Sequence, residues 1–221
     1  MTMTLKQAKA ELGGLGYPSK MPGTAFGISA KSCSVGAKLA KVPGSVCHGC
    51  YALKANYLYP SVAQAHETRL RGLENPAWVA GMVMQLNHAH STGKGRKGPI
   101  ASGWHRWHDS GDLQSVEHLA KICEVARQTP HIRHWLPTRE ISVLKAYVAA
   151  GNVVPANLTI RVSATMVDGA ATKVWPTVSL VHTAEAEKGA HVCPAPKQDG
   201  KCGDCRKCWD PDVKKVSYAL H

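Results

Sequence analysis

The sequence is poor in acidic side chains and contains a single phenylalanine. Its 221 residues include 15 Asp and Glu against 27 Lys and Arg, which gives a formal charge of +12 at pH 7. No stretch comes near the roughly 18–20 consecutive apolar residues that a membrane-spanning helix needs. Residues 1–9 also lack the apolar segment of a signal peptide. We therefore expect a cytoplasmic protein without membrane contact.

Several well-known catalytic motifs are missing as well. The chain has no G-x-S-x-G step, no P-loop, and no H-x-x-x-H pair with a glutamate base. These motifs are typical of serine hydrolases, nucleoside-triphosphate-binding proteins and zinc proteases. None of those classes has support in the sequence.

Cysteine, by contrast, is abundant, with eight residues in the chain. A reducing cytosol keeps thiols free, so cysteines there are more often metal ligands or nucleophiles than disulfides. The odd one out is Cys123, which lies on the apolar stripe of an expected helix and should be a small buried hydrophobe. The other seven form a C-x13-C-x2-C group and a C-x8-C-x2-C-x2-C group: Cys33, Cys47 and Cys50, then Cys193, Cys202, Cys205 and Cys208.

The spacing of these cysteines indicates a metal site. Two residues between cysteines let both sulfurs turn toward one centre. The run Cys202, Cys205, Cys208 is a recurring way to hold a [4Fe–4S] cluster, with a fourth thiolate from a remote position. Zinc also uses C-x2-C pairs and stays the alternative. We expect one or two [4Fe–4S] clusters, with all seven cysteines of the two groups as ligands.

The overall pattern predicts an α/β fold. Hydrophobic residues make up 44% of the chain and charged residues 19%, an ordinary globular composition. Strand and helix patterns alternate from residue 100 onward, which favours a parallel sheet with helices outside or a partial (β/α) barrel. We expect one domain over residues 1–221, with the cysteine-rich segment 191–210 packed on it. The expected strands are 24–30, 100–108, 132–136, 158–163 and 177–183, and the expected helices are 5–12, 61–73, 76–87, 115–128 and 139–150.

Polar side chains follow several of these strands at their carboxyl ends, where ligands bind in parallel α/β proteins. His108, Asp109 and Asp112 follow the second strand, and Arg139 follows the third. We take these four as candidate catalytic residues. Both cysteine groups also follow strands, so we expect metal-binding loops at one rim and one composite site. Simpler roles stay open: the aspartates can cap the helix near Ser115, and Arg139 can pair with one of them.

Five segments carry a combined pattern: K-S-C at 31–33, C-H-G-C-Y-A at 47–52, R-W-H-D-S-G-D at 106–112, L-P-T-R at 136–139, and the last cysteine group. In this order they resemble the bacteriophage gene product 88-like family. That resemblance implies a phage-borne metal protein acting in the host cytoplasm. The Cys-Tyr-Ala step is more distantly similar to phage proteins related to radical S-adenosylmethionine barrels. The chain departs from those because thirteen residues separate Cys33 from Cys47 and the Gly-Gly-Glu step is missing.

These observations favour an iron–sulfur protein with redox or cluster-dependent chemistry on an unknown substrate. The sequence is compatible with an enzyme and with an electron carrier, and the expected partner is a small-molecule ligand or a redox partner. One alternative is a zinc-stapled nucleic-acid-binding protein that uses the positive charge, with Trp104 and Trp107 available to stack on bases. Another is a phage protein that binds a host partner and keeps a structural metal.

Overall fold

One sheet of seven strands organises the computed structural model, which describes residues 3–96 and 98–220. The strand order is β1-β4-β5-β6-β7-β9-β8, and every neighbouring pair is parallel. The carboxyl ends of parallel strands meet at one edge of a sheet, here termed the carboxyl edge. The strands are β1 (Thr24–Phe26), β4 (Trp104–Trp107), β5 (Arg133–Thr138), β6 (Leu158–Ser163), β7 (Val178–His182), β8 (His191–Val192) and β9 (Lys215–Ala219), and a separate hairpin pairs β2 (Lys94–Gly95) with β3 (Gly98–Pro99).

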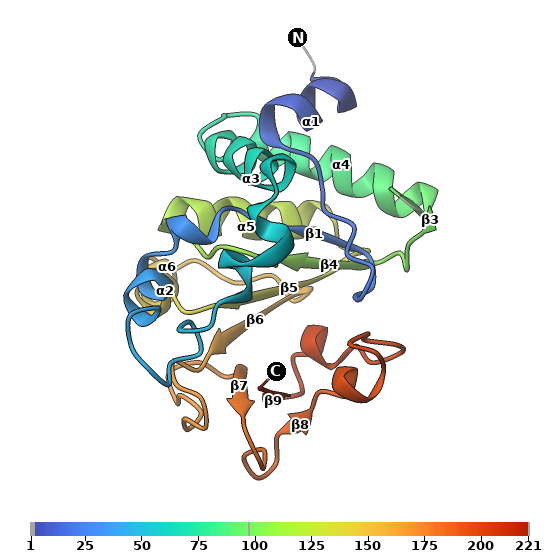
Figure 1. Cartoon of the computed structure of the whole chain (residues 1–221). Coiled ribbons are helices and arrows are strands. Elements are labelled where there is room, and N and C mark those ends of the chain that lie inside the picture. Colours follow the sequence, from blue (N-terminus) through green and yellow to red (C-terminus); the bar gives the residue numbers. More distant parts are fainter. Residues whose placement is uncertain (1–2, 97, 221) are drawn as a thin grey trace.

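Most helices cover one face of this sheet (Figure 1). There α4 packs against α5, with α1 against α4 and α6 against α5. Within the described part of the chain, no helix is long and apolar enough to cross a membrane. The α-helices are α1 (Leu5–Leu12), α2 (Ser34–Leu39), α3 (Pro60–Gly72), α4 (Trp78–Thr92), α5 (Val116–Gln128) and α6 (Ile141–Ala149), and the short 3₁₀ turns are η1 (Ala30–Ser32), η2 (Tyr51–Leu53), η3 (Ala55–Leu58), η4 (Ala195–Lys197) and η5 (Lys207–Trp209).

Local sequence accounts for helix α5. The Oγ of Ser115 accepts a hydrogen bond from the backbone N of His118 at 3.1 Å, which fixes where the helix begins. Leu119, Ile122 and Cys123 recur at helical spacing and are fully buried. Cys123 is therefore the buried hydrophobic thiol that the sequence predicts.

An aromatic cluster fills the space between the sheet and its helices. Phe26 of β1, Trp78 of α4 and Trp107 of β4 are fully buried. Their ring centroids lie 5.8 to 5.9 Å apart, within the range in which aromatic pairs stabilise a core. The cluster anchors β1 and β4, the two strands after which the first cysteine loop and the 108–112 loop begin.

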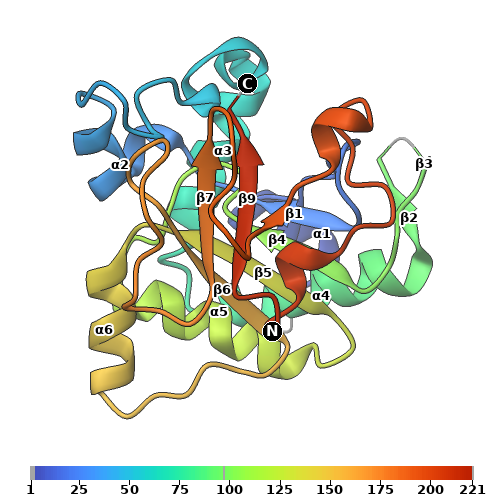
Figure 2. The ribbon, with the colours of Figure 1, turned by 90° about the horizontal axis from the view of Figure 1, so that it is seen from below.

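The connection from β8 to β9 covers the opposite face (Figure 2). Neighbouring parallel strands cannot be joined by a tight turn, so residues 193–214 must return to the amino end of β9. They cross the free face of the sheet, where the ring of Trp209 lies 5.7 Å from that of Trp104 and 5.1 Å from that of Trp135. The second cysteine group therefore lies along the face of the sheet and not at the carboxyl edge, which corrects the expectation of a single rim.

The predicted fold class is confirmed as an α/β fold with a parallel sheet flanked by helices. The predicted ranges correspond to real elements from α1 to β7, with ends shifted by a few residues. The sequence did not predict α2, β2, β3, β8 or β9. Helix α2 has six residues and strand β8 has two, which is too short for a periodic pattern to show.

Candidate functional site

Three cysteines lie in the long loop after β1, and we term them the rim cysteines: Cys33, Cys47 and Cys50. The loop runs along the carboxyl edge, where the backbone N of Val46 donates to the carbonyl of Thr165 beyond β6 at 2.9 Å. A methyl group at Gly36 would lie 3.6 Å from the Sγ of both Cys33 and Cys47. The two sulfurs thus border the same small space, which is open because residue 36 has no side chain.

Glu140 holds the loop from the side of β5. Its carboxylate accepts hydrogen bonds from the Oγ of Ser34 at 2.9 and 3.0 Å and from the backbone N of Val35 at 2.9 Å. These bonds fix the first turn of α2 directly after Cys33. Glu140 is buried, so the contact is shielded from water.

Asp112 joins the loop after β4 to the end of β5. Its carboxylate accepts from the Oγ1 of Thr138 at 2.5 Å and from the backbone N of Arg139 at 2.9 Å. A third bond comes from the backbone N of Leu113 at 2.8 Å. Burial raises the pKa of Asp112 to about 6, although all three bonds oppose that rise. The side chain is a structural tie between two loops of the carboxyl edge.

The loop between His108 and Asp112 contains buried polar atoms. His108 has a left-handed backbone with φ of 53° and is buried, and burial holds its pKa well below the ordinary value. Neither ring nitrogen has a hydrogen-bond partner among the described residues, and the same holds for the Oδ1 of Asp109, the Oγ of Ser110 and the Nε of Arg139. Unpartnered buried polar atoms point to a bound ligand or ordered water.

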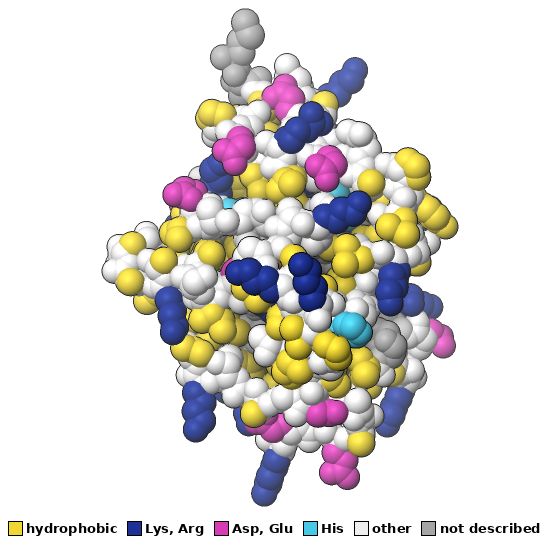
Figure 3. All heavy atoms as spheres, turned by 60° about the vertical axis from the view of Figure 1, so that its left-hand side comes forward, with side chains coloured by type: hydrophobic (Ala, Val, Ile, Leu, Met, Phe, Trp, Pro, Cys, Tyr) yellow, Lys and Arg dark blue, Asp and Glu magenta, His cyan; other side chains and the backbone are white. Residues whose placement is uncertain are grey.

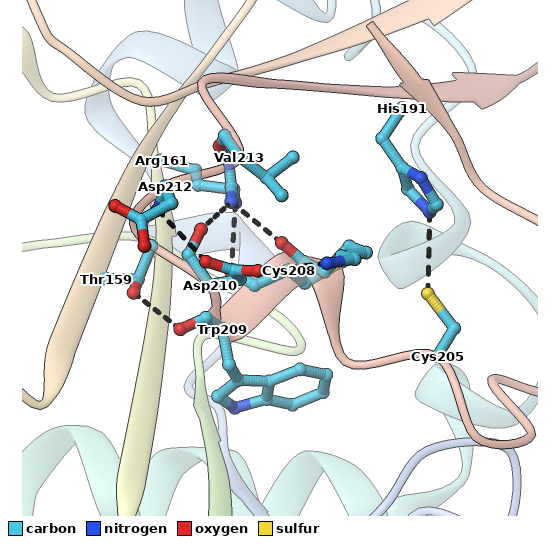
Figure 4. Close-up of polar contacts among 10 residues, drawn as sticks. Thr159, Arg161, His191, Cys205, Cys208, Trp209, Asp210, Asp212 and Val213 are labelled. Atoms are coloured by element: carbon cyan, nitrogen blue, oxygen red, sulfur yellow. Dashed lines mark hydrogen bonds and ion pairs between the residues drawn. The ribbon is translucent and has the colours of Figure 1, made fainter.

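Four further cysteines lie on the free face of the sheet, and we term them the face cysteines: Cys193, Cys202, Cys205 and Cys208. The Sγ of Cys205 lies 3.5 Å from the Nε2 of His191, and the two point toward each other (Figure 4). The Sγ of Cys208 lies 3.1 Å from the Oη of Tyr218. The backbone N of Cys205 donates to the carbonyl of Cys202 at 3.0 Å, so the C-x2-C step forms a turn.

Arg161 holds the face cysteines against the sheet (Figure 4). It lies in β6 and is fully buried. Among the described residues no carboxylate forms an ion pair with it; Asp210 pairs with Lys207 at 3.1 Å and acts on Arg161 only electrostatically. Its guanidinium instead donates to four backbone carbonyls at 2.8 to 2.9 Å, those of Lys207, Cys208, Asp210 and Val213.

Five thiols of the two groups ionise with difficulty, those of Cys33, Cys47, Cys193, Cys202 and Cys208. Burial raises the pKa of Cys33 to about 12, and Asp112 and the other rim thiols add to the rise. Burial likewise raises the pKa of Cys208 to about 12, against the effect of its contact with Tyr218. Such thiols are protonated and weakly nucleophilic at neutral pH, and a bound metal must displace the proton. Burial also raises the pKa of Cys47, Cys193 and Cys202.

A cavity of about 680 Å³ opens beside the face cysteines. It is bordered by Trp104, Trp209, Arg133 and Arg206, together with Cys205. The guanidinium of Arg206 lies 5.4 Å from the ring centroid of Trp104. The volume is within the range of small-molecule sites.

The structure does not by itself display a metal site. In residues 3–96 and 98–220, no group of three or more His, Cys, Asp or Glu side chains is arranged around a point where one ion could bind. The predicted cysteine ligation therefore stays a prediction.

The simpler roles considered for the polar candidates do not hold for Asp112 and Arg139. Asp112 does not cap α5, because Ser115 does so and the carboxylate of Asp112 is engaged with β5. The side chain of Arg139 makes no ion pair within the described part of the chain. Sequence reasoning missed Glu140 and Arg161. A signal for the latter was present, since one arginine stands inside the otherwise apolar strand L-T-I-R-V-S.

Together, the sheet and these side chains define a parallel α/β protein with cysteine groups at the carboxyl edge and on the free face. The sequence model of the family described as Gene product 88 matches residues 2–211, almost the whole chain. The chain belongs to this bacteriophage gene product 88-like family. No curated protein and no solved structure matches it. The more distant resemblance to radical S-adenosylmethionine proteins has no support in these comparisons.

Proposed function

We propose that the protein binds a [4Fe–4S] cluster through the face cysteines and uses it for redox or cluster-dependent chemistry. The observation that carries this proposal is Arg161. A fully buried guanidinium without an ion pair is costly, and the one carboxylate of the described residues that interacts with Arg161 electrostatically, Asp210, is paired with Lys207. A four-thiolate cluster held by Cys208 and its neighbours supplies negative charge, and the carbonyl of Cys208 is already bound to Arg161 at 2.9 Å.

The arrangement of the loop also supports this proposal. Arg161 fixes the carbonyls of residues 207, 208, 210 and 213, so the backbone that carries the last cysteine is held before any metal binds. Preorganised loops lower the entropic cost of ligation. Because the pKa values of Cys193, Cys202 and Cys208 are raised by burial, cluster binding must release protons.

The fold and the free thiols support the same proposal. Strands β1, β4, β5, β6 and β7 lie in chain order, which is the arrangement of a (β/α) barrel, so we infer that the sheet is part of such a barrel. All eight cysteines are free thiols, as a reducing cytoplasm requires.

Metal analysis of protein purified without oxygen tests the proposal. We expect a brown protein with visible absorption, iron and sulfide in equal amounts, and little zinc. Replacing Cys205 by serine should remove cluster absorption, whereas Cys123→Ala, a change at a core thiol, should leave it intact. A colourless protein with stoichiometric zinc would contradict the proposal and favour the zinc alternative.

The cavity beside Cys205 supports a second candidate, binding of single-stranded nucleic acid. Its wall combines Trp104 with Arg133 and Arg206, and bases stack on such side chains. On the face drawn in Figure 3, Lys and Arg side chains are scattered among hydrophobic ones, so that face offers no continuous basic stripe. Titration of a labelled oligonucleotide at increasing salt decides the question, because phosphate binding weakens steeply with salt. Affinity that is independent of salt removes this candidate.

A further inference from the structure

We propose that the rim cysteines form a second, separate [4Fe–4S] site, with three protein thiolates and one iron open to a small carboxylate. This inference rests on the proposed iron–sulfur function and extends it to Cys33, Cys47 and Cys50. It divides the seven cysteines between two sites of different kinds. The face site has four thiolates and is closed, while the rim site has three and can bind a ligand.

Packed side chains separate the two groups. Tyr51, next to Cys50 in the chain, has its Oη 3.5 Å from the Nη2 of Arg106. The guanidinium of Arg106 lies 4.6 Å from the ring centroid of Trp135. Trp135 in turn lies 5.1 Å from Trp209, which follows Cys208. A row of four side chains therefore runs from one group to the other, and we infer that each group holds its own cluster.

The rim group has the features of a built site. Its sulfurs at Cys33 and Cys47 border the space left by Gly36, at 3.6 Å from the position of a Cβ there. The loop that carries them is fixed to β5 through Glu140, whose carboxylate accepts from Val35 at 2.9 Å. Asp112 lies beside these thiols, but its bonds to backbone and Thr138 occupy it. Three thiolates thus leave one iron of a cluster without a protein ligand.

The positive charge beside this site indicates the class of ligand. Arg139 adds positive charge close to Cys33 and Cys47, and its Nε is buried without a partner among the described residues. A small carboxylate satisfies this guanidinium, because one oxygen can bind iron while the other accepts from Arg139.

Iron counting on the full chain tests the division into two sites. After anaerobic reconstitution we expect about eight iron atoms per chain, as two four-iron clusters require. Cys33→Ser and Cys205→Ser should each retain about half of that iron, the double variant almost none, and Cys123→Ala all of it. Circular dichroism identifies variants that fail to fold, and Cys50→Ala then replaces Cys33→Ser.

Other iron counts overturn the inference in distinguishable ways. If the wild-type chain binds one cluster and each of the two serine variants loses all of it, there is one composite site, and the proposed function survives. If only Cys205→Ser loses iron, the rim cysteines bind no cluster. A chain that binds zinc and no iron contradicts both the proposed function and this inference.

Electron paramagnetic resonance tests the open iron with acetate as the probe. In Cys205→Ser, which keeps the rim site, acetate should shift the spectrum of the reduced cluster; in Cys33→Ser it should not. Replacing Arg139 by glutamine should raise the acetate concentration needed by about tenfold, the usual worth of a charged hydrogen bond. The exposed Arg71→Gln is the matched control. No acetate shift, or equal shifts in Arg139→Gln and Arg71→Gln, contradicts the ligand assignment.

Discussion

Arg161 makes five hydrogen bonds to backbone carbonyls, four at 2.8 to 2.9 Å and one to Val178 at 3.5 Å. The planar guanidinium can do this because its donors diverge in a fixed fork, which a lysine cannot reproduce. Removing it leaves several carbonyls buried without donors, and each such group costs about 1–3 kcal/mol. A single side chain of β6 therefore fixes the backbone of residues 207–213 within the segment 193–214.

Arg161→Gln should lower the free energy of unfolding by about 3–5 kcal/mol, the usual cost of breaking a buried polar network. Urea denaturation measures this, and limited trypsin digestion should show new cleavage at the lysines of segment 193–214. Arg71→Gln, on the exposed side of α3, should leave both unchanged. Equal stability of the two variants would show that the carbonyl contacts of Arg161 do not hold the segment.

Gly36 is a second position at which one residue matters, because its lack of a side chain leaves space beside the sulfurs of the rim cysteines. A Cβ there would lie 3.1 Å from the Cβ of Cys33 and 3.6 Å from two sulfurs. Gly36→Val should therefore lower iron bound at the rim site while the melting temperature stays similar, because glycine and valine both have modest helix propensity. Gly14→Val is the control, since Gly14 lies outside the rim loop and a Cβ there meets no atom within 4 Å. Full iron content in Gly36→Val would refute this prediction.

At the scale of elements, helix α2 depends on tertiary contacts. It has six residues, and its N-cap residue Cys33 provides no side-chain hydrogen bond. A helix this short is unstable alone, so its first turn relies on the carboxylate of Glu140 across the carboxyl edge. This contact places Cys33 and thereby links the end of β5 to the rim cysteines.

Glu140→Ala should destabilise the protein by about 1–3 kcal/mol, because the Oγ of Ser34 and the N of Val35 lose their acceptor. Hydrogen exchange should become faster in α2 while it stays slow in α5. Glu117→Ala, at an exposed position in α5, is the matched control and should leave α2 protected. Unchanged exchange of α2 in Glu140→Ala would mean that other contacts hold this helix.

At the scale of the whole molecule, the core contains several neutral histidines. The Oγ1 of Thr24 lies 3.0 Å from the Nε2 of His90 and 2.8 Å from the Nδ1 of His105. The Oγ1 of Thr129 lies 2.9 Å from the Nε2 of His134. Burial lowers the pKa of His90 to about 4 and of His134 to about 3, with His131 adding to both shifts and His90 to that of His134.

These shifts predict a protein that loses stability in mild acid. A histidine side chain in the unfolded chain has a pKa near 6.5. Below that pH the unfolded chain therefore binds protons at these histidines, while the folded core does not. Stability is full above pH 6.5 and falls as the pH drops toward the folded pKa values. Each of these buried histidines should lower the free energy of unfolding by about 2 kcal/mol when the pH falls from 7 to 5.

Urea denaturation at pH 7 and pH 5 measures this loss. In His134→Gln the difference between the two pH values should be about 2 kcal/mol smaller than in the wild-type chain. His131→Gln, at an exposed position, should retain most of the wild-type difference. An identical pH dependence in His134→Gln and the wild-type chain would show that His134 does not remain neutral in the folded state.

The sequence was informative where a signal is local. The apolar stripe that includes Leu119 and Cys123 predicted α5 and the buried thiol, and strand 158–163 was predicted with its actual ends. The core positions of His105 and His134 were not predictable, because partners such as Thr24 and Thr129 become neighbours only in the fold. Glu140 was missed for the same reason, since its partners lie more than one hundred residues away.

The sequence alone determined the α/β class, the parallel sheet, the family and the two cysteine groups, because periodicity, caps and motif spacing are properties of neighbouring residues. The tertiary structure decided where those groups lie. The crossover between β8 and β9 places Cys205 and Cys208 on the face of the sheet, and the loop after β1 places Cys33 and Cys47 at its edge. The physical reason is that parallel pairing joins distant segments, so the surroundings of each thiol are set by side chains such as Arg161 that no local pattern identifies.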